Sequence, residues 1–372
     1  MNARVPAEVF PPGEFLREEL EAREWTQQEL ADILDRPPRL ISELIAGKRA
    51  ITPETAKGLA DAFGTSPDYW MNLESQYQLS KVKLPNDNVA RKARLYGKFP
   101  VREMLRRGWV RMSENVDVLE QRFCEYFAIQ SVDETPALCH SAKKTHATAE
   151  TNPLQLAWLF RVRAMAVQQV VPAYSKAKLK AALEKLKALT LSAEEVRHVP
   201  RLLAEAGVRL VFVEPLAGSK MDGACFWLDD DKPVIGMTLR FDRIDNFWFV
   251  LRHEIEHVLR EDGKAEQEAV IDTDVGDSSE DLPECERLAN AAGAEFCVPS
   301  SELENFIARV QPYFSEEKVL RFAQRINVHP GLVVGQLQRR LGRHDFLRKH
   351  QVKVRALVIP SADVDGWGSF TE

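Results

Sequence analysis

Two histidines and a glutamate in the pattern His-Glu-x-x-His are the residues of this 372-residue sequence that most clearly indicate chemistry. His253 and His257 are four positions apart, and Glu254 follows the first of them. Residues four apart lie on one face of a helix, so both imidazoles can bind one metal ion, and zinc accepts histidine nitrogens. A glutamate beside the open coordination position can act as a general base on water. The pattern predicts a zinc site with His253 and His257 as ligands and Glu254 as the base.

A catalytic zinc site needs a third protein ligand, which must come from another segment. A second helix, predicted from about Glu284 to Phe296, offers Glu286. Asn290 follows one helical turn later and is a candidate to hydrogen-bond with one of the ligands. The sequence thus indicates three metal ligands on two helices, joined by an acidic loop over 261–284.

The residues of these two helices resemble a known family. His253-Glu254-Ile255-Glu256-His257 is followed by Glu286-Arg287-Leu288-Ala289-Asn290 and then by Pro299. In this pattern, over about residues 200–342, the sequence is similar to the ImmA/IrrE metallopeptidase-like proteins. The resemblance implies a zincin-like domain in which His253, His257 and Glu286 bind Zn²⁺. It also implies that Glu254 is the catalytic base for the cleavage of a protein substrate.

The sequence departs from the pattern of that family in two places. Glu256 stands where the family usually has Gly, and Ala292-Gly293 stands where it usually has Phe-Ala. A carboxylate at position 256 is expected beside the site, where it could alter metal affinity or block the substrate. Three alternatives stay open for the domain: an active zinc endopeptidase, a metal-binding or sensing domain without proteolysis, and a structural domain without metal.

The elements that must hold these residues form a predicted α+β domain over 201–345. A β-branched run at Val208–Val213 and a hairpin of Ala224–Leu228 with Val234–Leu239 predict a small sheet. The zinc-binding pattern lies in a helix predicted from about Arg243 to Arg260, whose apolar face would anchor the ligands. In an active peptidase, residues 224–228 are the expected edge strand that aligns an extended peptide.

Helices dominate the rest of the chain, so the predicted fold class is mainly α. Residues 112–200 form a helical middle region with helices at Val116–Phe127, Leu154–Val171 and Ser175–Leu189. The middle region shows no pattern that indicates chemistry. Residues 346–372 are predicted to be a C-terminal tail.

The first 80 residues carry the start signals of several short helices. Thr26 and Glu29 form a capping box, and Thr52-Pro53 and Ser66-Pro67 place a capping hydroxyl before a proline at the first helical position. Apolar residues recur at helical spacing in five segments between Pro11 and Leu79. This pattern predicts one compact domain of five helices.

Two of these helices have the spacing of a helix-turn-helix. The first runs from Thr26 to about Leu34, Asp35-Arg36-Pro37 makes the turn, and the second runs from Pro38 to Ile45 and stops at Gly47. In such a motif the second helix lies in the major groove of DNA. The plainer alternative is a helical bundle with a solvated polar face.

The candidate DNA-binding residues lie on and around this recognition helix. Arg39 can read guanine, Ser42 is a permissive contact, and Glu43 can accept from cytosine or face water. Gln27 and Gln28 begin the bracing helix and Lys48 and Arg49 follow the recognition helix, where phosphate contacts are expected. The full set of candidates is Gln27, Gln28, Arg36, Arg39, Ser42, Glu43, Lys48 and Arg49.

Residues 26–31, 41–56 and 64–73 resemble the HigA-type antitoxins of the Xre/Cro repressor superfamily. The resemblance covers about residues 10–79. It implies a lambda-repressor-like domain that binds an operator as a homodimer, autoregulates a toxin–antitoxin operon and can sequester a cognate toxin. Asp35-Arg36-Pro37-Pro38 departs from the family, which usually has Gly, an apolar residue and Ser or Thr there, so no base preference is carried over.

Charge is divided unevenly along the chain. The net charge is −6 overall, −6 over residues 1–80, +8 over 81–111 and −8 over 112–372. Residues 81–111 are predicted to be a basic linker that passes into a helix near Val101–Arg107. Their ten Lys and Arg residues could extend a DNA footprint onto flanking phosphates, or pair with acidic neighbours in a solvated linker.

Composition excludes an integral membrane protein, because no stretch approaches the ~18 to 20 consecutive apolar residues that a span needs. Residues 1–8 lack the apolar core of a signal peptide, and the five cysteines form no Cys-x-x-Cys pair, so we expect a reduced, cytoplasmic setting.

The whole sequence predicts an antitoxin-type transcriptional regulator that binds double-stranded DNA at an inverted repeat and carries a zinc-dependent endopeptidase-like domain. The alternative is a zinc metallopeptidase or metal sensor whose helix-turn-helix only targets it to DNA.

Overall fold

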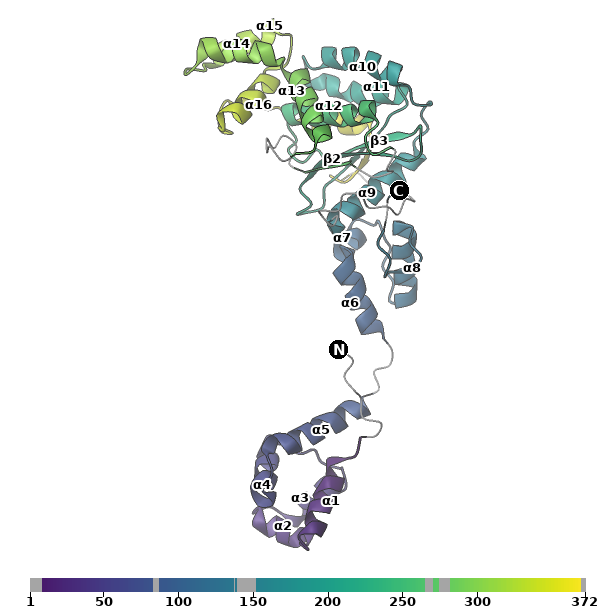
Figure 1. Cartoon of the computed structure of the whole chain (residues 1–372), viewed down its shortest axis with the longest axis vertical. Coiled ribbons are helices and arrows are strands. Elements are labelled where there is room, and N and C mark those ends of the chain that lie inside the picture. The colour runs from purple at the N-terminus through teal and green to yellow at the C-terminus, as the bar shows by residue number, and fades with distance from the viewer. Residues whose placement is uncertain are drawn as a thin grey trace. The chain divides into compact units, whose positions relative to one another are not determined.

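The computed structural model describes residues 9–82, 87–136, 138, 152–264, 270–273 and 282–368. The chain divides into two compact units, Met1–Val89 and Ala90–Glu372. The first unit is helical, and the second combines helices with one sheet (Figure 1). Among the described residues, no helix is long and apolar enough to cross a membrane.

The first unit consists of five short helices, as the sequence predicts. Thr26 caps the second helix in a full capping box: its hydroxyl accepts from the Glu29 N–H at 3.2 Å, and the Glu29 carboxylate accepts from the Thr26 N–H at 2.7 Å. Thr52 and Ser66 cap the fourth and fifth helices, also as predicted. The helices are α1 (Pro12–Ala22), α2 (Gln27–Ile33), α3 (Pro38–Ile45), α4 (Pro53–Phe63) and α5 (Pro67–Lys81).

One apolar core joins these five helices. Each contributes buried residues at helical spacing, among them Leu16, Ile41 and Trp70. Gly13 lets α1 approach α3 closely, because a Cβ at this position would lie 2.4 Å from the carbonyl oxygen of Ile45. The shared core therefore holds α2 and α3 in one fixed arrangement.

The second unit packs helices on both faces of one mixed sheet. Its early helices are α6 (Asn88–Lys98), α7 (Val101–Arg106), α8 (Val116–Phe127), α9 (Pro153–Gln168), α10 (Lys176–Leu189), the 3₁₀ helix η1 (Ala193–His198) and α11 (Val199–Glu205). The strands are β1 (Arg209–Val213), β2 (Met221–Trp227), β3 (Pro233–Met237), β4 (Val270–Thr273) and β5 (Asp363–Asp365). The later helices are α12 (Ile244–Arg260), α13 (Glu284–Cys297), α14 (Ser300–Val310), α15 (Glu316–Arg325), α16 (Pro330–Leu341), η2 (Arg348–His350), α17 (Arg355–Val358) and η3 (Ile359–Ser361).

The sheet has the strand order β4-β2-β3-β1-β5. The predicted hairpin is confirmed, because β2 and β3 are antiparallel, with Cys225 opposite Ile235. β1 pairs in parallel with both β3 and β5. β2 also pairs with β4, so it is an interior strand. The prediction that residues 224–228 form the sheet edge is therefore wrong, because part of the acidic loop adds β4 outside them. Residues 265–269 and 274–281 of that loop lie outside the described residues.

Helices cover both faces of the sheet, so the strand side chains are buried on both sides. In β1, Leu210 and Phe212 join the core that contains α12, whereas Val211 and Val213 join the core that contains α9. This alternation follows from the two-residue period of a strand. Trp158 of α9 donates its indole N–H to the Val213 carbonyl at 2.9 Å. Figure 1 shows α9 on the side of the sheet opposite α12 and α13.

Most of the basic stretch 81–111 is helical, so the linker prediction is wrong there. The helix expected near Val101–Arg107 is present as α7, but α6 was not predicted. Leu95, Met104 and Trp109 are buried in the core of the second unit. The few apolar residues of this stretch lie at helical spacing and pack into that core. Because they stand among many Lys and Arg residues, this spacing was not recognised from the sequence.

The predicted middle region and C-terminal tail are integral to the sheet unit. α9 covers one sheet face, and residues 363–365 of the predicted tail add β5 beside β1. Asp365 accepts from the Trp109 indole N–H at 3.1 Å and pairs with Arg161. The boundaries predicted at 112, 201 and 346 therefore all fall inside one compact unit.

Candidate functional site

The turn between α2 and α3 gives these helices the helix-turn-helix arrangement. Asp35 adopts a left-handed backbone with φ of 50°, and the Arg36 N–H donates to the Ala31 carbonyl at 2.9 Å. Asp adopts this conformation more readily than most residues other than Gly and Asn. Asp35 thus fills the turn where the antitoxin resemblance leads us to expect Gly, and Pro38 starts α3 at its first position.

α3 directs its apolar face inward and its polar face to solvent. Ile41 and Leu44 are buried, whereas the Arg39 side chain is 88% exposed. Seven of the eight candidate DNA-binding residues are exposed, and the eighth, Glu43, is half-buried. The exposed seven are Gln27, Gln28, Arg36, Arg39, Ser42, Lys48 and Arg49.

Two acidic residues contact candidate DNA-binding arginines of this surface. Glu54 of α4 forms an ion pair with Arg36. Glu43 accepts from Arg39 Nε at 2.8 Å and lies 3.6 Å from Arg49 Nη1. The hydrogen bond from Arg39 lowers the pKa of Glu43. Part of the negative charge of the first unit is therefore neutralised locally.

Half of the ten Lys and Arg residues in 81–111 contact partners within the second unit. This pairing favours the alternative in which the basic stretch is balanced by its own neighbours, and it leaves fewer cations for DNA. The contacts are Arg91 with Glu120 at 2.6 Å, Arg94 with Asp133 at 3.7 Å, Lys98 with the Val132 carbonyl at 2.6 Å, Arg106 with Glu103 at 2.6 Å, and Arg107 with the Glu214 carbonyl at 2.6 Å.

The His-Glu-x-x-His pattern and Glu286 meet where α12 packs against α13. His253, His257 and Glu286 each offer a ligand atom, and these atoms lie within 4.8 Å of one another. The two Nε2 atoms are 3.1 Å apart, and the Glu286 carboxylate lies 3.3 Å from His253 Nε2 and 3.6 Å from His257 Nε2. The structure thus brings together the three residues predicted as ligands.

Small residues let α13 approach α12 closely enough for this meeting. A Cβ on Gly293 would lie 3.0 Å from the Phe249 carbonyl oxygen of α12. Ala289, one turn earlier on α13, is fully buried. Gly293 departs from the metallopeptidase family pattern, but a small residue suits this helix contact.

Asp262 also contacts this cluster, although it was not predicted from the sequence. Glu261 ends α12 in a left-handed conformation with φ of 62°, and the Asp262 N–H then donates to the His257 carbonyl at 3.0 Å. The Asp262 carboxylate lies 2.9 Å from His257 Nδ1. A carboxylate oxygen at this distance accepts a hydrogen from Nδ1, so the contact favours the neutral tautomer of His257 that presents the Nε2 lone pair to the cluster. A carboxylate just past the end of a metal-binding helix is the signal that could have identified it.

The donor set fits zinc in chemistry as well as in position. Two imidazole nitrogens and one carboxylate are a ligand set of catalytic zinc sites, in which a fourth position stays open. A histidine ligand whose other ring nitrogen donates to a carboxylate is also typical of such sites. Within the described part of the chain, His253, His257 and Glu286 are therefore the residues that could hold Zn²⁺.

Glu254 is fully buried between α12 and β2. Its carboxylate lies directly against Gly223, because a Cβ at position 223 would lie 2.0 Å from Glu254 Oε1. The glycine leaves the space that the carboxylate occupies. A glycine inside a predicted strand often marks such a close approach, and this was the available sequence signal.

Glu256 lies differently from expectation, whereas Asn290 lies where it was expected. Glu256 forms an ion pair with Arg252 at 2.7 Å and is not among the three clustered ligands, so the carboxylate expected beside the site is held elsewhere. Asn290 lies one turn after Glu286 on α13, as expected. Its buried Oδ1 has no hydrogen-bond partner within the described part of the chain, so its predicted bond to a ligand stays a prediction.

Asp262→Ala is expected to weaken zinc binding by about 10- to 100-fold, because it removes the acceptor that fixes the orientation of His257. Competition with a chromogenic chelator measures this change. Asp230→Ala is the matched control, since Asp230 is an exposed acid in the turn between β2 and β3. Wild-type zinc affinity in Asp262→Ala would contradict the assigned role.

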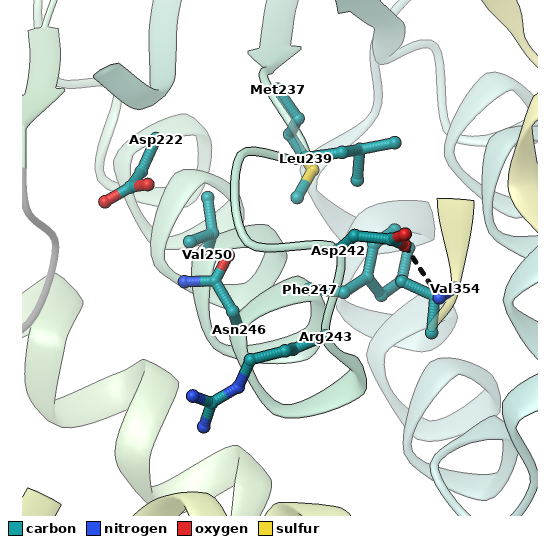
Figure 2. A pocket seen from close by; sticks show the side chains of 9 residues that line it. All are labelled: Asp222, Met237, Leu239, Asp242, Arg243, Asn246, Phe247, Val250 and Val354. Atoms are coloured by element: carbon teal, nitrogen blue, oxygen red, sulfur yellow. Dashed lines mark hydrogen bonds between the residues drawn. The ribbon is translucent and has the colours of Figure 1, made fainter. Parts of the chain in front are cut away.

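A narrow cleft next to α12 does not include the metal-ligand candidates. Asp242 faces Val354 there and accepts from its N–H at 3.0 Å (Figure 2). Neither histidine of the His-Glu-x-x-His pattern nor Glu286 is among the lining residues, so this cleft is distinct from the metal-ligand candidates. The lining residues are Asp222, Met237, Leu239, Asp242, Arg243, Asn246, Phe247, Val250 and Val354.

Comparison with known proteins finds similarity for the N-terminal unit. Residues 16–70 match the family model described as helix-turn-helix. An uncharacterized HTH-type transcriptional regulator, YddM of Escherichia coli K12, is 34% identical over 84 residues, which cover 23% of this chain and 88% of that protein.

Two solved structures are also similar. An addiction module antidote protein of the HigA family from Coxiella burnetii is 37% identical, with a TM-score of 0.19, over 19% of this chain and 79% of that one. The Pseudomonas aeruginosa antitoxin HigA, solved with the higBA promoter, is 32% identical, with a TM-score of 0.19, over 20% of this chain and 80% of that one.

The sequence match and the α2–α3 geometry fall on the same residues. The identity to the regulator extends over most of that protein and lies within about a quarter of this chain. By its N-terminal unit, the chain belongs to the helix-turn-helix family of transcriptional regulators.

Proposed function

We propose that this protein is an antitoxin-type transcriptional regulator that binds operator DNA through α2 and α3. The observation that carries the proposal is the polar face of α3, where Arg39 and Ser42 are exposed on a helix whose other face is buried in the core. Residues of this helix reach base edges when it lies in the major groove.

Phosphate contacts supply much of the affinity of such proteins, and the first unit must supply them despite its net negative charge. Lys48 and Arg49 follow α3, and Gln27 and Gln28 begin α2, where backbone N–H groups point outward and favour an anion. Because many basic residues of 81–111 have partners in the second unit, we assign phosphate contacts to these four residues.

We propose that the protein binds DNA as a homodimer. A two-fold dimer presents two recognition helices, so the operator is an inverted repeat with half-sites about 34 Å apart. A cognate toxin, bound by the same protein, is the partner that the antitoxin resemblance leads us to propose.

Arg39→Ala is expected to reduce the preference for the protein's own promoter over random duplex, because it removes a base contact. Lys48→Ala should weaken binding to both duplexes similarly and flatten the salt dependence, because it removes a phosphate contact. Gel-shift titrations at several salt concentrations measure both effects. A wild-type protein that binds its own promoter no better than random duplex would exclude operator binding.

A second function, zinc-dependent cleavage of a protein substrate, is proposed for the second unit. The convergence of His253, His257 and Glu286 within 4.8 Å favours it. When bound there, Zn²⁺ would polarise a substrate carbonyl and lower the pKa of water.

Glu254 is the residue that moves protons in this proposal. Its carboxylate accepts a proton from the attacking water and delivers it to the amine nitrogen that leaves when the peptide bond breaks. Gly223 and β2 fix its position, and Asp262 fixes the tautomer of His257. Since β2 is an interior strand, an extended substrate cannot pair with it while β4 is in place.

The alternative for this unit is a metal sensor without proteolysis. It shares the three ligands but has no need of a general base. The Glu254→Gln variant separates these two functions.

A further inference from the structure

We infer that Glu43 is a positioning residue of the recognition helix, which orients Arg39 toward guanine and does not itself read a base. The inference rests on the proposed binding of operator DNA by α3. It replaces the two roles that the sequence left open for Glu43, a cytosine contact and a solvated side chain.

Each oxygen of the Glu43 carboxylate faces a different guanidinium. Oε1 accepts from Arg39 Nε at 2.8 Å, and Oε2 lies 3.6 Å from Arg49 Nη1. Arg39 and Glu43 are four residues apart on α3, so their side chains lie on one helix face. The carboxylate therefore links the start of α3 to the residues that follow its end.

The backbone of Glu43 fixes the second of these arginines. Its carbonyl accepts from the Lys48 N–H at 2.9 Å and from the Arg49 N–H at 3.2 Å. Gly47 permits this turn with a left-handed φ of 64°. The chain after α3 therefore folds back onto Glu43, and Arg49 is held beside the carboxylate by its backbone as well as by its charge.

Exposure separates the roles of the three side chains. The Glu43 side chain is 26% exposed, whereas those of Arg39 and Arg49 are 88% and 57% exposed. The acid lies lower on the helix surface, and the arginines extend beyond it. A ligand that approaches α3 thus meets guanidinium groups before it meets the carboxylate.

The hydrogen bond uses Arg39 Nε, so the two Nη groups are the donors that this guanidinium can offer to DNA. Two parallel donors match O6 and N7 of guanine. The Glu43 carboxylate is less exposed than either guanidinium, so a base edge that approaches α3 meets Arg39 first. The geometry therefore predicts a guanine opposite Arg39 and no base read by Glu43.

Selection from a pool of random-sequence duplexes tests this inference, with the full-length protein in five forms: wild type, Arg39→Ala, Glu43→Ala, Glu43→Gln and the Arg39→Ala/Glu43→Ala double variant. Arg39→Ala should lose a guanine preference of about tenfold at one position of each half-site. Glu43→Ala should weaken that preference at the same position, and the double variant should resemble Arg39→Ala alone. Glu43→Gln keeps one acceptor oxygen and should retain more of the preference than Glu43→Ala.

The matched control is Asp61→Ala, which removes an exposed negative charge from α4 of the same unit. It corrects for the general gain in DNA affinity that loss of an acid produces, and its base preference should be that of wild type. Loss of preference at a different position in Glu43→Ala, or an unchanged profile, would overturn the inference while leaving operator binding intact. A wild-type protein that selects no sequence would overturn both.

Discussion

Glu286→Ala is expected to leave the protein without stoichiometric zinc, whereas the wild-type chain should bind it tightly. Three protein ligands, with water in the fourth position, complete a tetrahedron around zinc. Removal of the carboxylate leaves only two imidazoles as protein ligands. Because loss of a residue that merely orients a ligand costs about 10- to 100-fold in metal affinity, loss of a ligand should cost more than about 100-fold. Elemental analysis after growth in zinc-replete medium measures the occupancy. His257→Ala should give the same result.

The matched control for this experiment is Glu284→Ala. Glu284 is an exposed acid at the start of the same helix, α13, so the variant makes the same change in charge without touching the cluster. It should retain zinc fully. Full retention of zinc in Glu286→Ala, or absence of zinc from wild type, would mean that His253, His257 and Glu286 are not a zinc site.

Glu254→Gln is expected to lower hydrolysis of a protein substrate by about 100-fold or more while zinc content stays at the wild-type level. Glutamine has nearly the size of glutamate but cannot accept the proton of the attacking water, and general bases contribute about 10²- to 10⁴-fold. The side chain is buried against Gly223, so the similar size should preserve the fold. Cleavage of candidate partners, including a cognate toxin and the chain itself, is the measurement.

Glu256→Gln is the control on the same helix, because Glu256 pairs with Arg252 and lies outside the cluster. It should cleave at the wild-type rate. DNA affinity should be unchanged in both variants, since α2 and α3 belong to a separate compact unit. Absence of cleavage in wild type and Glu254→Gln alike would favour the sensor alternative, and loss of DNA binding in Glu254→Gln would show that the units are coupled.

Features that depend on short segments of chain could be predicted from the amino-acid sequence. Capping at Thr26, the helices of the first unit and the apolar spacing around His253 and His257 follow from backbone hydrogen bonding and a 3.6-residue period. The helix at Val116–Phe127 was predicted for the same reason, whereas the β2–β3 hairpin was predicted from two apolar runs that flank the turn-forming residues 229–233. Four-residue spacing alone places both imidazoles of the zinc pattern on one face.

Contacts between distant segments could not be predicted from the sequence, because they depend on how the whole chain packs. Asp262 reaches His257 because of the left-handed end of α12, and Glu254 has its space because Gly223 comes from another strand. The prediction of a linker over 81–111 was wrong because it relied on charge composition. A few apolar residues of this stretch pack into a core that the sequence does not reveal.

The same limit applies to the sheet. Hydrophobic alternation predicts that residues 224–228 form a strand, but it carries no information on which strands lie beside them. Pairing with β4 on one side and β3 on the other depends on where the acidic loop returns, and this made β2 an interior strand. Local patterns set the faces of helices and strands, whereas packing of the whole chain sets which faces and edges meet.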